Sequence, residues 1–69
     1  MSWNYRVMRK TVDGETSWGV HEVFYDDDGR VTGWTPEPVA VAGDSLEEIQ
    51  QQLARMAEAA ERPPLEFGP

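Results

Sequence analysis

The stretch HEVFYDDDG, residues 21–29, decides how the first half of the chain is interpreted. A histidine and a glutamate stand side by side, and two aromatic residues lead into three aspartates and a glycine. Three interpretations are open: a reaction centre, a metal-binding loop, or a β-strand that enters a tight turn. Alternating side chains up to Tyr25 favour a strand, and the Asp-Gly ending is typical of a turn because glycine adopts positive φ without strain.

Two further strands are predicted around this one. Residues 3–11 and 17–25 both alternate in polarity and are rich in aromatic and β-branched side chains, as strands with one buried face are. Asp13-Gly14 lies between them and predicts a hairpin turn. After the second turn, RVTGWT at residues 30–35 predicts a third strand. The sequence therefore predicts a three-stranded antiparallel β-meander.

Regular pairing across both turns divides the strand residues between two faces of the sheet. Odd positions of the first strand then lie opposite even positions of the second, and a one-residue slip would exchange the faces. The face expected to form the core collects Trp3, Tyr5, Val7, Trp18, Val20, Phe24 and Val31. The other face collects Arg6, Met8, Lys10, His21, Val23, Tyr25, Thr32 and Trp34.

A single helix is predicted after a proline-containing crossover, residues 35–44. Ser45 and Glu48 have the spacing of a capping box at a helix start, and Pro63-Pro64 ends the helix. One apolar stripe runs along it, at Leu46, Ile49, Leu53, Met56 and Ala60. We expect this stripe to cover the core face of the sheet; its spacing also fits a short, two-heptad coiled coil.

The predicted fold is therefore one α+β domain, β-β-β-α, over residues 1–62, with its helix packed on one sheet face. Residues 63–69 are a tail, which either is loose or packs back through Leu65 and Phe67. The chain of 69 residues has no cysteine and one histidine, so neither a disulfide nor a zinc site of the usual kind is expected.

The charge of the chain narrows the class of partner. The formal net charge is −7, and an acidic protein is a poor binder of bare nucleic acid because phosphate contacts supply most of that affinity. Such a protein could instead meet a basic protein partner, since charge attraction raises the rate of encounter; the alternative is that the acidic composition serves solubility alone. No signal peptide and no apolar run long enough to cross a membrane is found, so a cytoplasmic protein without membrane attachment is expected.

Residues 21–29 contain the main candidates for catalytic or metal-binding residues, but their spacing does not suit either role. His21 and Glu22 are neighbours in a strand and point to opposite faces, so they do not form an acid–base couple. Asp26–Asp28 are contiguous between strands, unlike the spaced oxygen ligands of a calcium loop. We expect no enzyme activity, no cofactor and no metal site.

The sheet face opposite the helix carries the most suggestive feature of the sequence. Aromatic residues, methionine and arginine are enriched at protein interfaces, and a contiguous apolar patch on a soluble domain usually marks a partner. The expected partner-binding residues are Arg6, Met8, His21, Val23, Tyr25 and Trp34. The alternative is that Leu65 and Phe67 cover this face. The simplest partner is a second copy of the chain.

Two resemblances follow from quoted motifs. GDSLEEIQQQLARMAEA, residues 43–59, after three strands resembles the helix opening of HicB-type antitoxins, whose module is a β-β-β-α half-RNase-H-like domain; Gly43, Asp44, Ser45 and Glu48 match. The family's proline-glycine segment in the third strand is missing, and no DNA-binding tail follows. WNYRVM, HEVFYDDDGRVTGWTPEPV and RPPLE are similar to segments of short, uncharacterised bacterial proteins.

These observations predict a small, acidic, non-enzymatic protein-binding module. The resemblance implies an antitoxin-like neutraliser of a basic partner. The alternatives are a homodimeric accessory protein and an acidic nucleic-acid mimic that inhibits a DNA- or RNA-handling protein.

Overall fold

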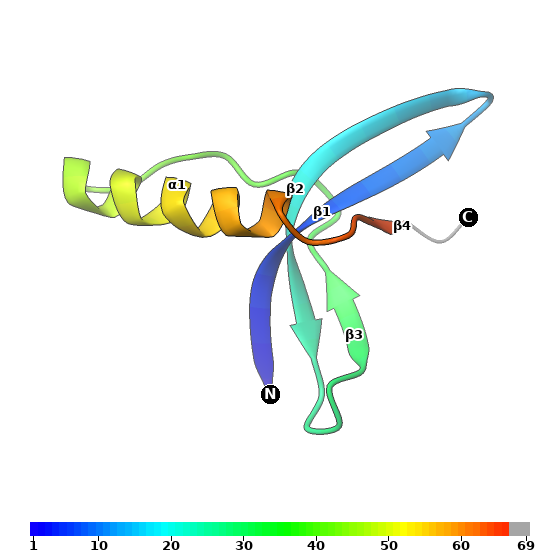
Figure 1. Ribbon diagram of the computed structural model, residues 1–69, viewed down its shortest axis with the longest axis horizontal. Coiled ribbons are helices and arrows are strands. Elements are labelled where there is room, and N and C mark those ends of the chain that lie inside the picture. The colour runs from blue at the N-terminus through cyan, green and yellow to red at the C-terminus, as the bar shows by residue number, and fades with distance from the viewer. Residues whose placement is uncertain (67–69) are drawn as a thin grey trace.

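The computed structural model describes residues 1–66 as four β-strands and one α-helix. The order along the chain is β1 (Ser2–Val12), β2 (Glu15–Tyr25), β3 (Val31–Trp34), α1 (Leu46–Ala60) and β4 (Leu65–Glu66). The strands form one curled sheet in the order β3-β2-β1-β4, with β4 parallel to β1 (Figure 1). The α+β class is confirmed, but the sheet is four-stranded and mixed because the chain returns to β1 after the helix. The expectation for Phe67 lies outside the described residues.

The hairpin of β1 and β2 forms as the turn chemistry predicts. Asp13 and Gly14 have φ of 53° and 82°, the positive values that a two-residue turn of this kind requires. The register runs from Val12 opposite Glu15 to Ser2 opposite Tyr25. Odd positions of β1 therefore lie opposite even positions of β2, as expected.

The turn between β2 and β3 is held by one aspartate. The Oδ1 atom of Asp26 accepts hydrogen bonds from the backbone N–H groups of Asp28 and Arg30, each at 2.9 Å. The turn expected for this acidic stretch is confirmed. Gly33 and Trp34 keep the expected parity, opposite Phe24 and Val23, but the register then shifts, so that Val31 and not Thr32 lies opposite Tyr25. The parity rule for the third strand consequently fails at this β-bulge.

Three arms meet where the C-terminal half of α1 crosses β1 (Figure 1). One arm is the N-terminal half of α1, another is the tip of the β1–β2 hairpin, and the third is formed by the N-terminal end of β1 with the β2–β3 turn. The extents along the principal axes are 39, 32 and 20 Å. Such an open shape leaves large side chains exposed on each arm.

The buried core lies on the face of the sheet that was expected to be open. Met8 is 2%, Val23 0% and His21 3% exposed, whereas Trp3 and Trp18 of the expected core face are 46% and 58% exposed. The assignment of the core to the Trp3 face is therefore wrong for these residues.

Two segments from later in the chain cover the sheet face that carries Met8 and His21. Leu65 of β4 lies beside Met8, and the crossover places Pro38 over Gly19 and His21. A Cβ atom at Gly19 would lie 2.8 Å from Pro38 Cγ and 3.2 Å from His21 Nε2. The crossover is anchored here by the Val39 N–H, which donates to the Val20 carbonyl at 2.8 Å.

The helix begins as predicted but is rotated from its expected orientation. Ser45 Oγ accepts from the Glu48 N–H at 3.1 Å, and the Glu48 carboxylate accepts from the Asp44 N–H at 2.7 Å. Ala59 is buried. Part of the apolar stripe instead faces solvent, with Leu46 72% and Leu53 49% exposed. The prediction that the whole stripe covers the sheet is wrong.

Candidate functional site

The six residues expected to bind a partner are mostly internal. Besides the three buried side chains, Arg6 is half-buried and donates to the Pro63 carbonyl at 2.7 Å. Tyr25 is also half-buried, and its hydroxyl donates to Asn4 Oδ1 at 2.8 Å. Trp34 alone among the six is classed with the exposed residues, at 38%. The open patch that the sequence predicts is therefore not formed by its six residues, Arg6, Met8, His21, Val23, Tyr25 and Trp34.

His21 forms a hydrogen bond that joins β2 to the residue after β3. Its Nδ1 atom lies 2.7 Å from the Thr35 carbonyl oxygen, and because a carbonyl only accepts, Nδ1 carries the proton of this hydrogen bond. The bond fastens the end of β3 to β2, beside the Thr35 N–H that donates to the Glu22 carbonyl at 3.0 Å. His21 thus helps to hold the crossover over the buried face.

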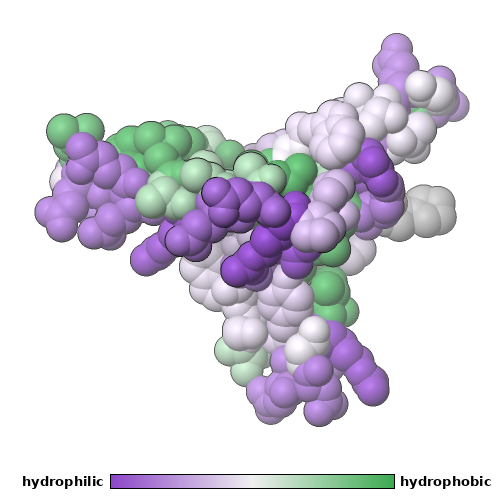
Figure 2. Space-filling view, viewed as in Figure 1, coloured by the Kyte–Doolittle hydropathy of each residue, from purple (hydrophilic) through white to green (hydrophobic). Residues whose placement is uncertain are grey.

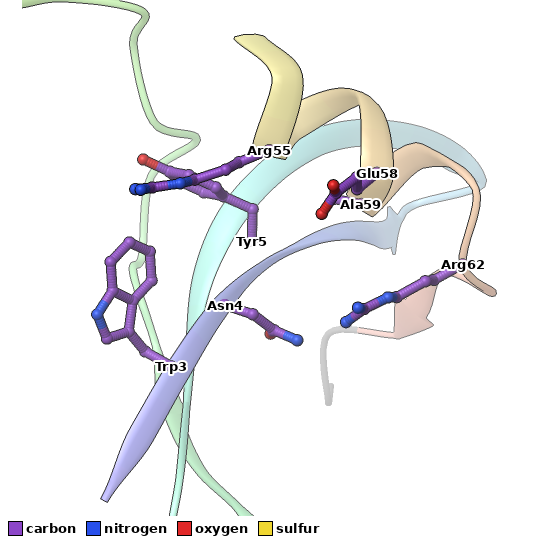
Figure 3. Close-up of a pocket in the computed structure, with 7 residues that line it drawn as sticks. All are labelled: Trp3, Asn4, Tyr5, Arg55, Glu58, Ala59 and Arg62. Carbon is purple, nitrogen blue, oxygen red and sulfur yellow. The ribbon is translucent and has the colours of Figure 1, made fainter. Parts of the chain in front are cut away.

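A hollow lies on the opposite side of the sheet, between β1 and α1. Its volume is about 420 Å³, and Figure 3 shows its lining. We call it the Trp3 groove. It is lined by Trp3, Asn4, Tyr5, Arg55, Glu58, Ala59 and Arg62.

Aromatic rings form one wall of the Trp3 groove. Trp3 and Tyr5 point to the same side of β1 because they are two positions apart, and their rings meet edge to face with centroids 5.3 Å apart. The hydroxyl of Tyr5 lies 3.5 Å from Gln52 Nε2 of α1. The tyrosine is thereby held between sheet and helix, while the tryptophan remains 46% exposed.

The other wall of the groove carries charge. Arg55 and Arg62 are seven residues apart, so they lie near the same side of α1 about two turns from each other. Glu58 stands between them (Figure 3). Among residues 1–66, neither arginine takes part in an ion pair. A ligand carboxylate could therefore approach two guanidinium groups and would be opposed by one glutamate.

The backbone edge of β1 borders the same groove. On the side away from β2, β1 pairs only at Met8 and Arg9, with Leu65 and Glu66 of β4. Within the described chain, the preceding residues of β1 have no strand on that side. An unpaired strand edge is a template for another extended segment.

A charge pair reinforces the short β1–β4 ladder. The guanidinium group of Arg9 donates to Glu66, with Nε 2.6 Å from the carboxylate. Hydrogen bonding to Glu66, together with its negative charge, raises the pKa of Arg9 above the ordinary value. Arg9 also lies 5.2 Å from the centre of the Trp18 ring, a cation–π contact.

Two of the three aspartates in the β2–β3 turn make contacts within the chain. Asp26 accepts the turn hydrogen bonds, and Asp27 forms an ion pair with the amino group of Met1 at 2.9 Å. In residues 1–66 no three histidine, cysteine, aspartate or glutamate side chains gather as metal ligands would. Over the same residues, no helix combines the length and apolar character needed to cross a bilayer.

Sequence reasoning assigned Trp3 and Tyr5 to a covered core and so missed the groove. The shared side of Arg55 and Arg62 on the helix was a signal for it, but their position over β1 depends on how α1 is rotated. Comparison with known proteins adds no further guide: no family model, no curated protein and no solved structure matches the chain.

Proposed function

We propose that this chain is a non-enzymatic protein-binding module that holds an extended segment of another protein in the Trp3 groove. The segment would lie beside the N-terminal half of β1 as an added strand, a common mode of peptide recognition. The observation that carries the proposal is the coincidence, in one hollow of about 420 Å³, of an unpaired strand edge with exposed aromatic and arginine side chains.

The side chains of the groove suit this occupant. Tryptophan, tyrosine and arginine are the residues most often responsible for binding energy at protein interfaces. Trp3 and Tyr5 offer apolar area to a side chain of the bound segment. Arg55 and Arg62 offer charge-assisted hydrogen bonds to a carboxylate, which are stronger than those between neutral groups. We therefore expect the segment to be extended and to carry an acidic residue or a C-terminal carboxylate.

The experiment is selection of octapeptides from a random library displayed on phage, followed by NMR of the ¹⁵N-labelled protein with the selected peptides. Peptides carrying a carboxylate should be enriched, and the largest shifts should fall on the amides of residues 2–6 and the Trp3 indole. Arg55→Glu should weaken binding about tenfold or more, since it replaces an attraction with a repulsion. Arg30→Glu is the matched control, because Arg30 is an exposed arginine outside the groove.

Two results would contradict the proposal. The selected peptides could bind Arg55→Glu and the wild-type chain equally well. Their NMR shifts could instead fall on the β2–β3 turn and not on β1. Either result would remove the Trp3 groove from the binding reaction.

A second candidate, an antitoxin-like neutraliser of a basic partner, is favoured by the net charge of −7. The β-β-β-α order that the chain has in common with HicB-type modules supports it at the level of architecture alone, and fold does not transfer function. Such a neutraliser should associate with one basic protein, and the association rate should fall steeply with added salt. A salt-independent rate would count against it.

A further inference from the structure

The exposed apolar side of α1 is a feature that the proposed function does not use. Leu46, Leu53 and Ala60 follow one another at intervals of seven residues, and Gln50 and Ala57 lie beside them. Together these five residues, the α1 strip, occupy a sector of about 80° around the helix axis. All five are exposed, and none is charged. Figure 2 shows apolar surface along one side of this arm and polar surface along the other.

The rotation of the helix explains the strip. Ala59 is buried, and Gln52, Met56 and Ile49 are half-buried, so the sheet-facing sector is centred about 100° away from the strip. The acidic and basic side chains of α1 occupy the remaining surface. The helix therefore has three faces where a helix lying on a sheet needs only two: one packed, one charged, and one apolar and uncovered.

We propose that the α1 strip is the interface of a homodimer, in which two copies of the chain pack their helices antiparallel about a two-fold axis at Leu53. Leu53 is the middle residue of the 15-residue helix. An axis there places Leu53 against Leu53 of the second copy and Leu46 against its Ala60. Each large side chain at one end of the strip thus meets a small one, which lets the helices approach closely.

Adjacent residues extend the same arrangement. The two-fold at Leu53 also brings Ile49 opposite Ala57 of the second copy, again a large residue against a small one. Gln52 ties the preceding segment to the helix, donating to the Ala40 carbonyl at 3.1 Å and accepting from the Ala42 N–H at 3.0 Å. Val41 lies between these anchors and is 42% exposed, which adds apolar area beside the helix.

The total surface of the chain supports a second copy as the occupant. Its accessible surface is 5149 Å², whereas a monomeric protein of 7.8 kDa exposes about 4,400 Å². The excess of about 750 Å², to which all three arms contribute, is comparable with the ~800 Å² that each partner buries in an interface of standard size. The strip also carries no charge that would repel an identical surface, although the chain as a whole is strongly acidic.

The dimer is compatible with the Trp3 groove. Arg55 lies about 160° around the helix from Leu53, so the groove opens on the side away from the two-fold axis. Each dimer would present two grooves. The inference does not depend on the proposed function, because its test requires no ligand.

The first measurement is the molecular mass in solution by sedimentation equilibrium. Wild-type protein should have twice the 7.8 kDa mass of one chain. Leu53→Lys should halve that mass, because it sets two positive charges against each other at the axis. Gln51→Lys is the matched control and should remain dimeric, since residue 51 is exposed but lies outside the strip. A monomeric wild-type protein at millimolar concentration would overturn the proposal.

Cysteine cross-linking keeps the test valid if Leu53→Lys fails to fold. The chain has no cysteine, and closely packed helices bring facing Cα atoms to about 5 Å, within the range of a disulfide. Leu53→Cys should form a covalent dimer on mild oxidation, and Gln51→Cys should not.

Mixed cross-linking reports the direction of the helices. Leu46→Cys and Ala60→Cys should each form no covalent dimer under oxidation, but their mixture should form the covalent heterodimer. Self-linking of each of these variants alone would indicate parallel helices and contradict the antiparallel arrangement. Failure of Leu53→Cys to link would contradict the two-fold at Leu53.

Discussion

Truncation of Val23 to alanine is the sharpest test of which sheet face forms the core. Val23 is 0% exposed, so Val23→Ala removes two methyl-sized groups from a closed environment. The lost transfer free energy is about 1.6 kcal/mol, and incomplete closure of the cavity raises the total to about 2–3 kcal/mol. The whole domain is expected to be stable by only about 3–10 kcal/mol, so this single change removes a large part of its stability.

Val31→Ala is the control with the same chemistry. Val31 also lies in a β-strand, but it is 45% exposed, so its truncation should cost about 1 kcal/mol or less. Thermal unfolding by circular dichroism, at one fixed protein concentration because association adds stability, should give a Tm lower by about 8–20 °C for Val23→Ala. If Val31→Ala lowered Tm as much as Val23→Ala, the assignment of the core to the Val23 face would be refuted.

Two further predictions concern the crossover and the helix start. Gly19→Ala should lower Tm more than Gly33→Ala, because the new Cβ would lie 2.8 Å from Pro38 Cγ, whereas at Gly33 the nearest atom is 3.9 Å away; equal effects would show that Pro38 does not rest on Gly19. Ser45→Ala should cost about 1 kcal/mol in urea unfolding through loss of the cap on the Glu48 N–H, and Ser45→Asp, which can also cap, should restore it. An Asp variant as unstable as the alanine variant would argue against capping.

Local chemistry in this sequence predicts the hairpins well. Asp13-Gly14 supplied both the turn and the register of β1 with β2, and Ser45 with Glu48 located the start of α1. These features depend on residues a few positions apart, and the type of each residue determines its preference for a turn or a helix cap. The β-bulge beside Tyr25 was not predicted, because the same acidic turn accommodates more than one register.

Alternation could not identify which face of the sheet is buried. It shows which side chains point the same way, but the covering segments come from elsewhere in the chain. Pro38 covers Gly19 and His21, and Leu65 joins β1 beside Met8, and neither contact is encoded in the strands that it covers. The Trp3 groove was missed for the same reason, since its existence depends on how far α1 rotates over Tyr5.

The pairing of β4 with β1 means that this sheet cannot be completed before residue 66 has been synthesised. Arg6 reaches Pro63, and Arg9 reaches Glu66, each across 57 positions of sequence. The β1–β2 hairpin can close as soon as Tyr25 leaves the ribosome, but Met8 and Arg9 on the other edge of β1 stay without a neighbouring strand until Glu66 has emerged. During that interval the nascent chain presents an open strand, and contacts of such long range form slowly. Shortening the chain before residue 65 should therefore yield a species that aggregates and not a smaller folded domain.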